Sequence, residues 1–124
     1  MCNDKIDTPV VLDAAVLKSL ESLDPQGTSR LIQRVLTTYL ASLDRIRQQL
    51  ANGRNDNDLR AILLAAHTLK SSSASVGALT LSARCAQVEG AARDGKGGEL
   101  PSMVDQLIAE IGRVEVAVQG LLSA

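Results

Sequence analysis

Hydrophobic residues recur at intervals of three and four along most of the chain, which is the period of an amphipathic α-helix. The pattern divides into five segments, separated by residues that start or stop helices. The first segment covers Asp13–Leu23, with Asp13 as its N-cap, and ends at a turn over residues 24–27 that contains a proline and a glycine. The second starts near Thr28 and stops at Asn52-Gly53, a pair that favours a left-handed helix end.

The three later segments have equally clear boundaries. The third starts near Asp56, a good N-cap, and runs to about Val76, after which Gly77 permits a tight corner into a fourth helix over residues 78–94. Residues 95–98 read Gly-Lys-Gly-Gly and predict a flexible loop. The last helix carries Pro101 in its first turn, where the missing N–H is harmless. Its hydrophobic stripe consists of Leu100, Val104, Leu107, Ile111, Val114, Val118 and Leu121.

Four long helices with short connections predict an all-α fold, an antiparallel four-helix bundle with a short additional N-terminal helix as a lid. The composition agrees, because Tyr39 is the only aromatic residue and an aliphatic core suits helix packing better than a sheet. The 124 residues are expected to form a single domain, residues 1–124, in which residues 1–9 are a flexible N-terminal segment.

Charge and cysteine usage exclude several classes of function. The formal net charge is −1 with acidic and basic residues mixed, which argues against a nucleic-acid partner. No apolar run approaches the roughly 20 residues of a membrane-spanning helix, and we expect no membrane insertion and no signal peptide. Cys2 and Cys85 do not make a disulfide framework, so we expect reduced thiols in a cytoplasmic protein. One histidine, two distant cysteines and scattered carboxylates predict no metal site.

The only histidine, His67, lies on the third predicted helix, roughly 130° from the middle of its hydrophobic stripe. On a solvent-facing helix surface it can act as a nucleophile toward a partner that docks from outside. The cation of Lys70, one turn later, could neutralise a phosphoryl group. The other residues that share or flank this face are small or aliphatic, which leaves room for a docking protein; they are Ser71, Ala74, Leu63 and Leu64.

The segment 66–78, Ala-His-Thr-Leu-Lys-Ser-Ser-Ser-Ala-Ser-Val-Gly-Ala, resembles the central motif of histidine-containing phosphotransfer (HPt) domains of two-component phosphorelays. The likeness consists of His67, a lysine at +3 and Gly77 at +10 on a helix hairpin of the expected size, followed by Leu81, Cys85 and Val88-Glu89. The flanking helices agree in length and order, so the resemblance covers nearly the whole chain. Ser71 departs from the glycine that many members have; serine is still small, and its hydroxyl could bond the imidazole or the phosphoryl group.

The resemblance implies that His67 accepts a phosphoryl group from a receiver-domain aspartate and passes it to another receiver, with no autokinase or ATP-binding activity. The chain also lacks the spacing of a Gly-rich phosphate loop. In this interpretation Nε2 of His67 attacks in line and Lys70 steadies the equatorial oxygens. Glu89 or Gln87, on the fourth helix, is a candidate to accept a hydrogen bond from the other ring nitrogen. No cofactor is expected on this chain, and Mg²⁺ is expected on the receiver.

The expected partners are response-regulator receiver domains and a hybrid sensor histidine kinase, with the chain itself a monomer. The main alternative is an interaction module that binds another protein through the His67 face without phosphotransfer. An enzyme in its own right is disfavoured, because Cys85 occupies a position that predicts burial and no second histidine could activate it. The carboxylates of the last helix are expected to be solvent-facing charges; they are Glu99, Asp105, Glu110 and Glu115.

Overall fold

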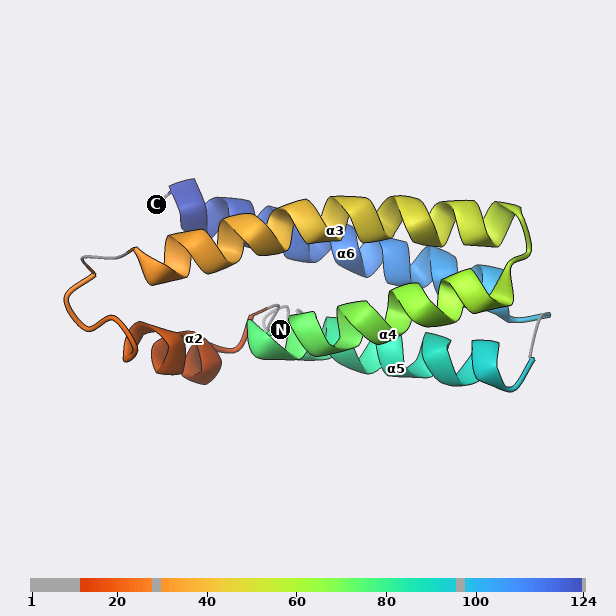
Figure 1. The fold of residues 1–124 in the computed structure, drawn as a ribbon, viewed down its shortest axis with the longest axis horizontal. Coiled ribbons are helices and arrows are strands. Elements are labelled where there is room, and N and C mark those ends of the chain that lie inside the picture. The colour runs from red at the N-terminus through yellow and green to blue at the C-terminus, as the bar shows by residue number, and fades with distance from the viewer. Residues whose placement is uncertain (1–11, 28–29, 96–97, 124) are drawn as a thin grey trace, which may run out of the picture.

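The computed structural model describes residues 12–27, 30–95 and 98–123, which form helices and no strand. The elements are α2 (Ala14–Glu21), α3 (Leu31–Asn55), α4 (Leu59–Ser75), α5 (Leu79–Arg93) and α6 (Leu100–Ser123). Helices α3 to α6 run antiparallel to their neighbours, and α2 lies at one end of the bundle (Figure 1). The predicted all-α four-helix bundle with a short additional N-terminal helix is confirmed. None of the helices described is long and apolar enough to cross a membrane.

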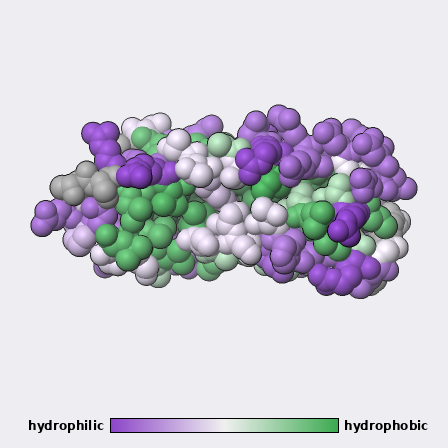
Figure 2. Space-filling view, viewed as in Figure 1, coloured by the Kyte–Doolittle hydropathy of each residue, from purple (hydrophilic) through white to green (hydrophobic). Residues whose placement is uncertain are grey.

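The position of α2 follows from the unequal lengths of the bundle helices. Helices α3 and α6 have 25 and 24 residues, whereas α4 and α5 have 17 and 15. At about 1.5 Å per residue, the long pair extends roughly 13 Å beyond the short pair. Helix α2 continues the line of the short pair and packs against α3 (Figure 1). Hydrophobic side chains gather on the surface at this end, and polar side chains dominate the other (Figure 2).

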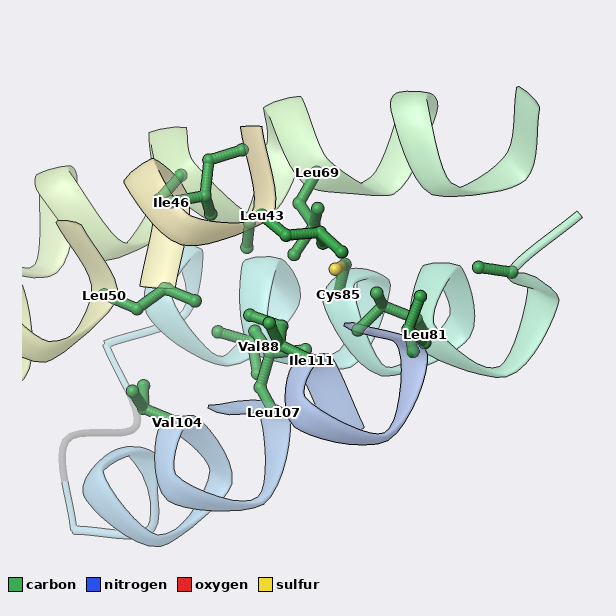
Figure 3. Packing of buried hydrophobic residues seen from close by; sticks show 14 of the residues in the cluster. Leu43, Ile46, Leu50, Leu69, Leu81, Cys85, Val88, Val104, Leu107 and Ile111 are labelled. Carbon is green, nitrogen blue, oxygen red and sulfur yellow. The ribbon is translucent and has the colours of Figure 1, made fainter. Parts of the chain in front are cut away.

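The core is aliphatic and runs along the axis of the bundle, where side chains from α3, α4, α5 and α6 meet (Figure 3). Every residue of the predicted α6 stripe is buried except Leu121, which is 45% exposed because it lies in the last turn of the helix. Cys85 is buried at the centre of the core as a free thiol. Cys2 and the predicted flexible segment 1–9 lie outside the described residues.

The predicted boundary between the second and third helices is wrong by several residues. Asn52 and Gly53 lie inside α3, and the left-handed residue is Asn57, with φ of 56°. The N-cap of α4 is Asp58 rather than Asp56; its carboxylate accepts a hydrogen bond from the Ala61 amide. Gly53 serves close packing instead, since a Cβ there would lie 3.0 Å from Cγ1 of Ile62.

The start of α3 also differs from the prediction. Thr28 lies outside the described residues, and the helix begins at Leu31, after Arg30 in the left-handed conformation with φ of 53°. Arg30 provides no side-chain cap. The carboxylate of Asp24 substitutes for it by accepting a hydrogen bond from the Leu31 amide at 3.2 Å.

Gly77 forms the predicted tight corner between α4 and α5, with φ of 86°. Its carbonyl accepts a hydrogen bond of 2.7 Å from the amide of Asp13, the residue whose side chain caps α2. A Cβ on Gly77 would lie 3.0 Å from the Asp13 nitrogen. The corner therefore needs glycine for its backbone conformation and for the close approach of α2.

Glu110 is not the solvent-facing charge that the sequence suggests, because its side chain is only 2% exposed. It lies on the same face of α6 as Leu107 and Val114, three residues before it and four after it. Its charge is balanced by Arg113, whose guanidinium donates to Oε1 at 2.6 and 2.9 Å, and Arg84 of α5 lies 3.9 Å away. Glu99 and Asp105 are exposed as expected, whereas Glu115 is mostly covered and pairs with Arg47 of α3.

One polar contact crosses the core between α3 and α4. The hydroxyls of Tyr39 and Ser73 are 2.7 Å apart and both side chains are buried. Burial raises the pKa of the Tyr39 phenol well above its usual value, so the phenol stays neutral. The only aromatic residue of the chain therefore has its polar atom satisfied inside an aliphatic core.

Replacing Gly77 by alanine should destabilise the fold by about 1–3 kcal/mol, because the new Cβ meets backbone at a left-handed φ. Gly112→Ala is the matched control. It lies within α6, where an added Cβ would have nothing within 4 Å, and should stabilise by about 0.5–1 kcal/mol. Urea denaturation measures both; equal stability of Gly77→Ala and the unaltered chain would contradict this account of the corner.

Replacing Ser73 by alanine should cost about 1–3 kcal/mol, because it leaves the buried Tyr39 hydroxyl without its partner. Removing both hydroxyls, in Tyr39→Phe with Ser73→Ala, should recover part of that loss. Chemical denaturation of the two single variants and the double variant measures the coupling. Strictly additive losses would mean that the hydrogen bond contributes nothing.

Candidate functional site

The residues predicted to carry the chemistry lie on the α4–α5 hairpin, the most closely associated helix pair of the bundle. The His67 side chain projects from α4 and is 59% exposed, as the helical pattern predicts. Lys70, one turn later, is 35% exposed and lies on the same side. A hydrogen bond of 2.9 Å from the Ser82 hydroxyl to the Lys70 carbonyl ties this turn of α4 to α5.

A single carboxylate organises the site. Glu89 of α5 is 6% exposed, and its Oε2 lies 2.8 Å from Nδ1 of His67. Its Oε1 accepts a hydrogen bond of 2.7 Å from Nζ of Lys70. Nη2 of Arg93 donates to Oε2 at 3.0 Å. One buried anion thus holds an imidazole and two cations.

These contacts keep the Glu89 carboxyl ionised. Its pKa is lowered, chiefly by the hydrogen bond from Lys70 and then by that from His67, against an opposing effect of burial. An ionised carboxylate can only accept hydrogen bonds, so the Nδ1 atom that it contacts carries a proton. In the neutral ring this tautomer leaves the lone pair on Nε2. The geometry therefore leaves Nε2 as the ring nitrogen with a free lone pair.

The other predicted site residues surround this cluster. Leu64, Ser71 and Ala74 are exposed, while Leu63 is partly buried against the core. The Ser71 hydroxyl makes no hydrogen bond to His67, although both residues are described. Gln87 is exposed, and of the two residues considered for the imidazole contact, Glu89 makes it.

Arg93 was not identified from the sequence. The sequence does place Arg93 four residues after the oppositely charged Glu89, a spacing that brings two side chains together on a helix. Such pairs are common on solvated surfaces, so the spacing alone gave no reason to select this one. What distinguishes Arg93 is that its partner is buried and also holds His67 and Lys70.

Cys85 lies one turn before Glu89 but takes no part in the cluster. The thiol is fully buried, and burial raises its pKa to about 12, so it is protonated and unreactive at neutral pH. Within residues 12–27, 30–95 and 98–123, no group of three or more His, Cys, Asp or Glu side chains is placed to hold a metal ion.

Comparison with solved structures identifies the same fold in two proteins. Histidine-containing phosphotransfer protein B from Pseudomonas aeruginosa PAO1 superposes with a TM-score of 0.82 at 23% identity, covering 94% of this chain and 97% of that one. A rice protein described as a putative histidine-containing phosphotransfer protein gives a TM-score of 0.77 at 22% identity, covering 91% and 82%. Comparison with curated proteins found no match.

The family comparison is more specific than these distant likenesses. Residues 34–117, well over half of the 124-residue chain, match the family described as Hpt domain. The matched region contains α4 and α5 complete, and with them His67, Lys70, Glu89 and Arg93. The chain therefore belongs to the Hpt domain family, the histidine phosphotransfer domains of phosphorelays.

Proposed function

We propose that His67 is the phosphoacceptor of this domain, taking a phosphoryl group from a receiver-domain aspartate and passing it to a second receiver. The observation that carries the proposal is the contact between Nδ1 of His67 and the buried Glu89 carboxylate, which leaves the lone pair on Nε2 of an exposed ring. The chain acts as a carrier in this scheme and has no autokinase activity of its own.

In the proposed step, the Nε2 lone pair attacks phosphorus in line while the bond from phosphorus to the aspartate oxygen breaks. The aspartate leaves as a carboxylate, and the ring keeps its proton on Nδ1. Lys70 can reach the equatorial oxygens, because its ammonium lies on the same face of α4 and is held by Glu89. The receiver supplies Mg²⁺ and the acidic pocket, so this chain needs no cofactor.

The surface around His67 supports docking of a receiver. Ser71 and Ala74 are exposed and small, so they allow close approach to the ring, and Leu64 adds apolar area at 49% exposure. A hybrid sensor histidine kinase that carries such a receiver fits the role of donor, and one copy of this chain suffices for each transfer.

His67→Gln should abolish labelling when the chain is incubated with a receiver phosphorylated on its aspartate. The label on the unaltered chain should be lost in acid and retained in alkali, as expected for phosphorus bound to nitrogen. Glu110→Gln, which changes a buried side chain on α6 that does not contact His67, should be labelled normally. Label that persists in His67→Gln would exclude His67 as the acceptor, and absence of label from any cognate receiver would favour a binding module.

Lys70→Ala should slow transfer at least about tenfold and leave the fold intact, since hydrogen bonds to charged groups contribute about 1.5–3 kcal/mol. Lys18→Ala on α2 is the matched control, because it removes an exposed lysine of another helix. Rapid-quench transfer assays and circular dichroism measure the two effects. A transfer rate equal to that of Lys18→Ala would remove Lys70 from the mechanism.

A further inference from the structure

We propose that the negative charge of Glu89 keeps phosphorylated His67 protonated on Nδ1, and so makes its phosphoryl group readily transferred and short-lived. Glu89 is then a positioning residue that sets the lability of the carrier as well as the tautomer of the ring. The inference rests on the proposed function, because it concerns the phosphorylated form of His67.

The geometry places the charge directly on the relevant ring atom. Oε2 of Glu89 lies 2.8 Å from Nδ1, and because the carboxylate is 6% exposed while the ring is 59% exposed, water screens the interaction only in part. A neutral amide at this position could accept the same hydrogen bond without supplying charge. The hydrogen bond alone would therefore fix the tautomer, and the charge of the carboxylate has a separate effect.

The net charge of the cluster falls when a phosphoryl group arrives. Lys70 and Arg93 contribute two positive charges and Glu89 one negative charge, a formal sum of +1 with a neutral ring. A dianionic phosphoryl group on Nε2 brings the sum to zero while the ring keeps its proton on Nδ1, and loss of that proton would bring the sum to −1. The phosphorylated site therefore favours the protonated ring.

Protonation decides how easily the bond between phosphorus and nitrogen breaks. When a nucleophile attacks the phosphoryl group of a ring protonated on Nδ1, the bonding electrons return to Nε2 and a neutral imidazole leaves. No proton has to move in that step. The unprotonated ring would leave as an imidazolate anion, a much poorer leaving group. Neutral imidazole is the leaving group whether the attacking nucleophile is an aspartate oxygen of the next receiver or a water molecule.

The cations that face the ring are already engaged by the same carboxylate. They are Lys70 on α4 and Arg93 on α5, both of which contact Glu89. Other titratable groups near the cluster are the Cys85 thiol on α5 and the Tyr39 phenol on α3. Burial raises the pKa of both, so both are neutral over the pH range of the test and leave the charge balance unchanged.

The test measures the decay of phosphohistidine on the full chain between pH 5 and 9, after labelling with phosphoramidate, a small donor that needs no receiver. We expect the decay rate to fall as pH rises through the pKa of the phosphorylated ring. In Glu89→Gln the midpoint should move down by about one pH unit, so that decay above the midpoint is about tenfold slower. Glu110→Gln is the matched control and should keep the original profile, since its carboxylate pairs with Arg113 instead.

Arg93→Met provides a change of the opposite sign. Removing this cation leaves the phosphorylated cluster more negative, so the midpoint should move up, by less than one unit because Arg93 is 61% exposed. General loosening of the hairpin would shift both variants in the same direction. Opposite shifts therefore distinguish an effect of charge from a structural one.

A measurement on the unaltered chain avoids any dependence on variants that fail to fold. Nitrogen-15 NMR of the phosphorylated chain should show Nδ1 protonated to a higher pH than in a short phosphohistidine peptide. An equal midpoint in chain and peptide, or an unchanged decay profile in folded Glu89→Gln, would overturn the inference. Failure of phosphoramidate and of every phosphorylated receiver to label His67 would instead overturn the proposed function.

Discussion

The buried carboxylate of Glu89 is the interaction on which the site depends. A carboxylate that is 6% exposed needs partners, and the α4–α5 hairpin provides three of them, His67, Lys70 and Arg93. Each of these side chains projects from the bundle toward solvent, where it would otherwise have many rotamers. Pairing with one fixed anion orients all three, so the surface around His67 has a defined arrangement of side chains.

The rest of the fold keeps that hairpin in register. The corner at Gly77 sets the direction of α5 relative to α4, and its carbonyl accepts a hydrogen bond from Asp13, the N-cap of α2. The Ser82 hydroxyl of α5 donates a hydrogen bond to the Lys70 carbonyl of α4, and the hydrogen bond between Tyr39 and Ser73 links α3 to α4. Rigid helices are better supports for a reactive group than loops, because packing locks their side-chain positions. An exposed histidine can therefore have a defined tautomer and orientation.

Two buried carboxylates illustrate how similar residues acquire different roles. Glu110 is about as buried as Glu89, but both of its charged partners, Arg113 and Arg84, are permanent cations. These three side chains form an ion cluster between α5 and α6. Glu89 shares its charge with a histidine whose ring remains accessible. The difference lies in the partner side chains and in which face of the bundle they reach, and the residue type alone does not reveal it.

The sequence by itself determined the helices, their order and the exposed position of His67, because hydrophobic periodicity reports directly which face of each helix is buried. It also placed Lys70 beside the histidine, since spacing within one helix fixes neighbours. The predicted helix end at Asn52-Gly53 was wrong, because Gly53 lies inside α3 and allows close packing against Ile62 instead of forming a left-handed turn.

Contacts between helices were decided only by the tertiary structure. The choice of Glu89 over Gln87, the recruitment of Arg93 and the burial of Glu110 each depend on how α5 is rotated against its neighbours. Successive residues of a helix are about 100° apart, so Gln87 and Glu89 point roughly 160° apart and only one of them can face α4. Sequence periodicity determines which face is buried, whereas the pairing of polar groups across two faces requires their relative positions in space.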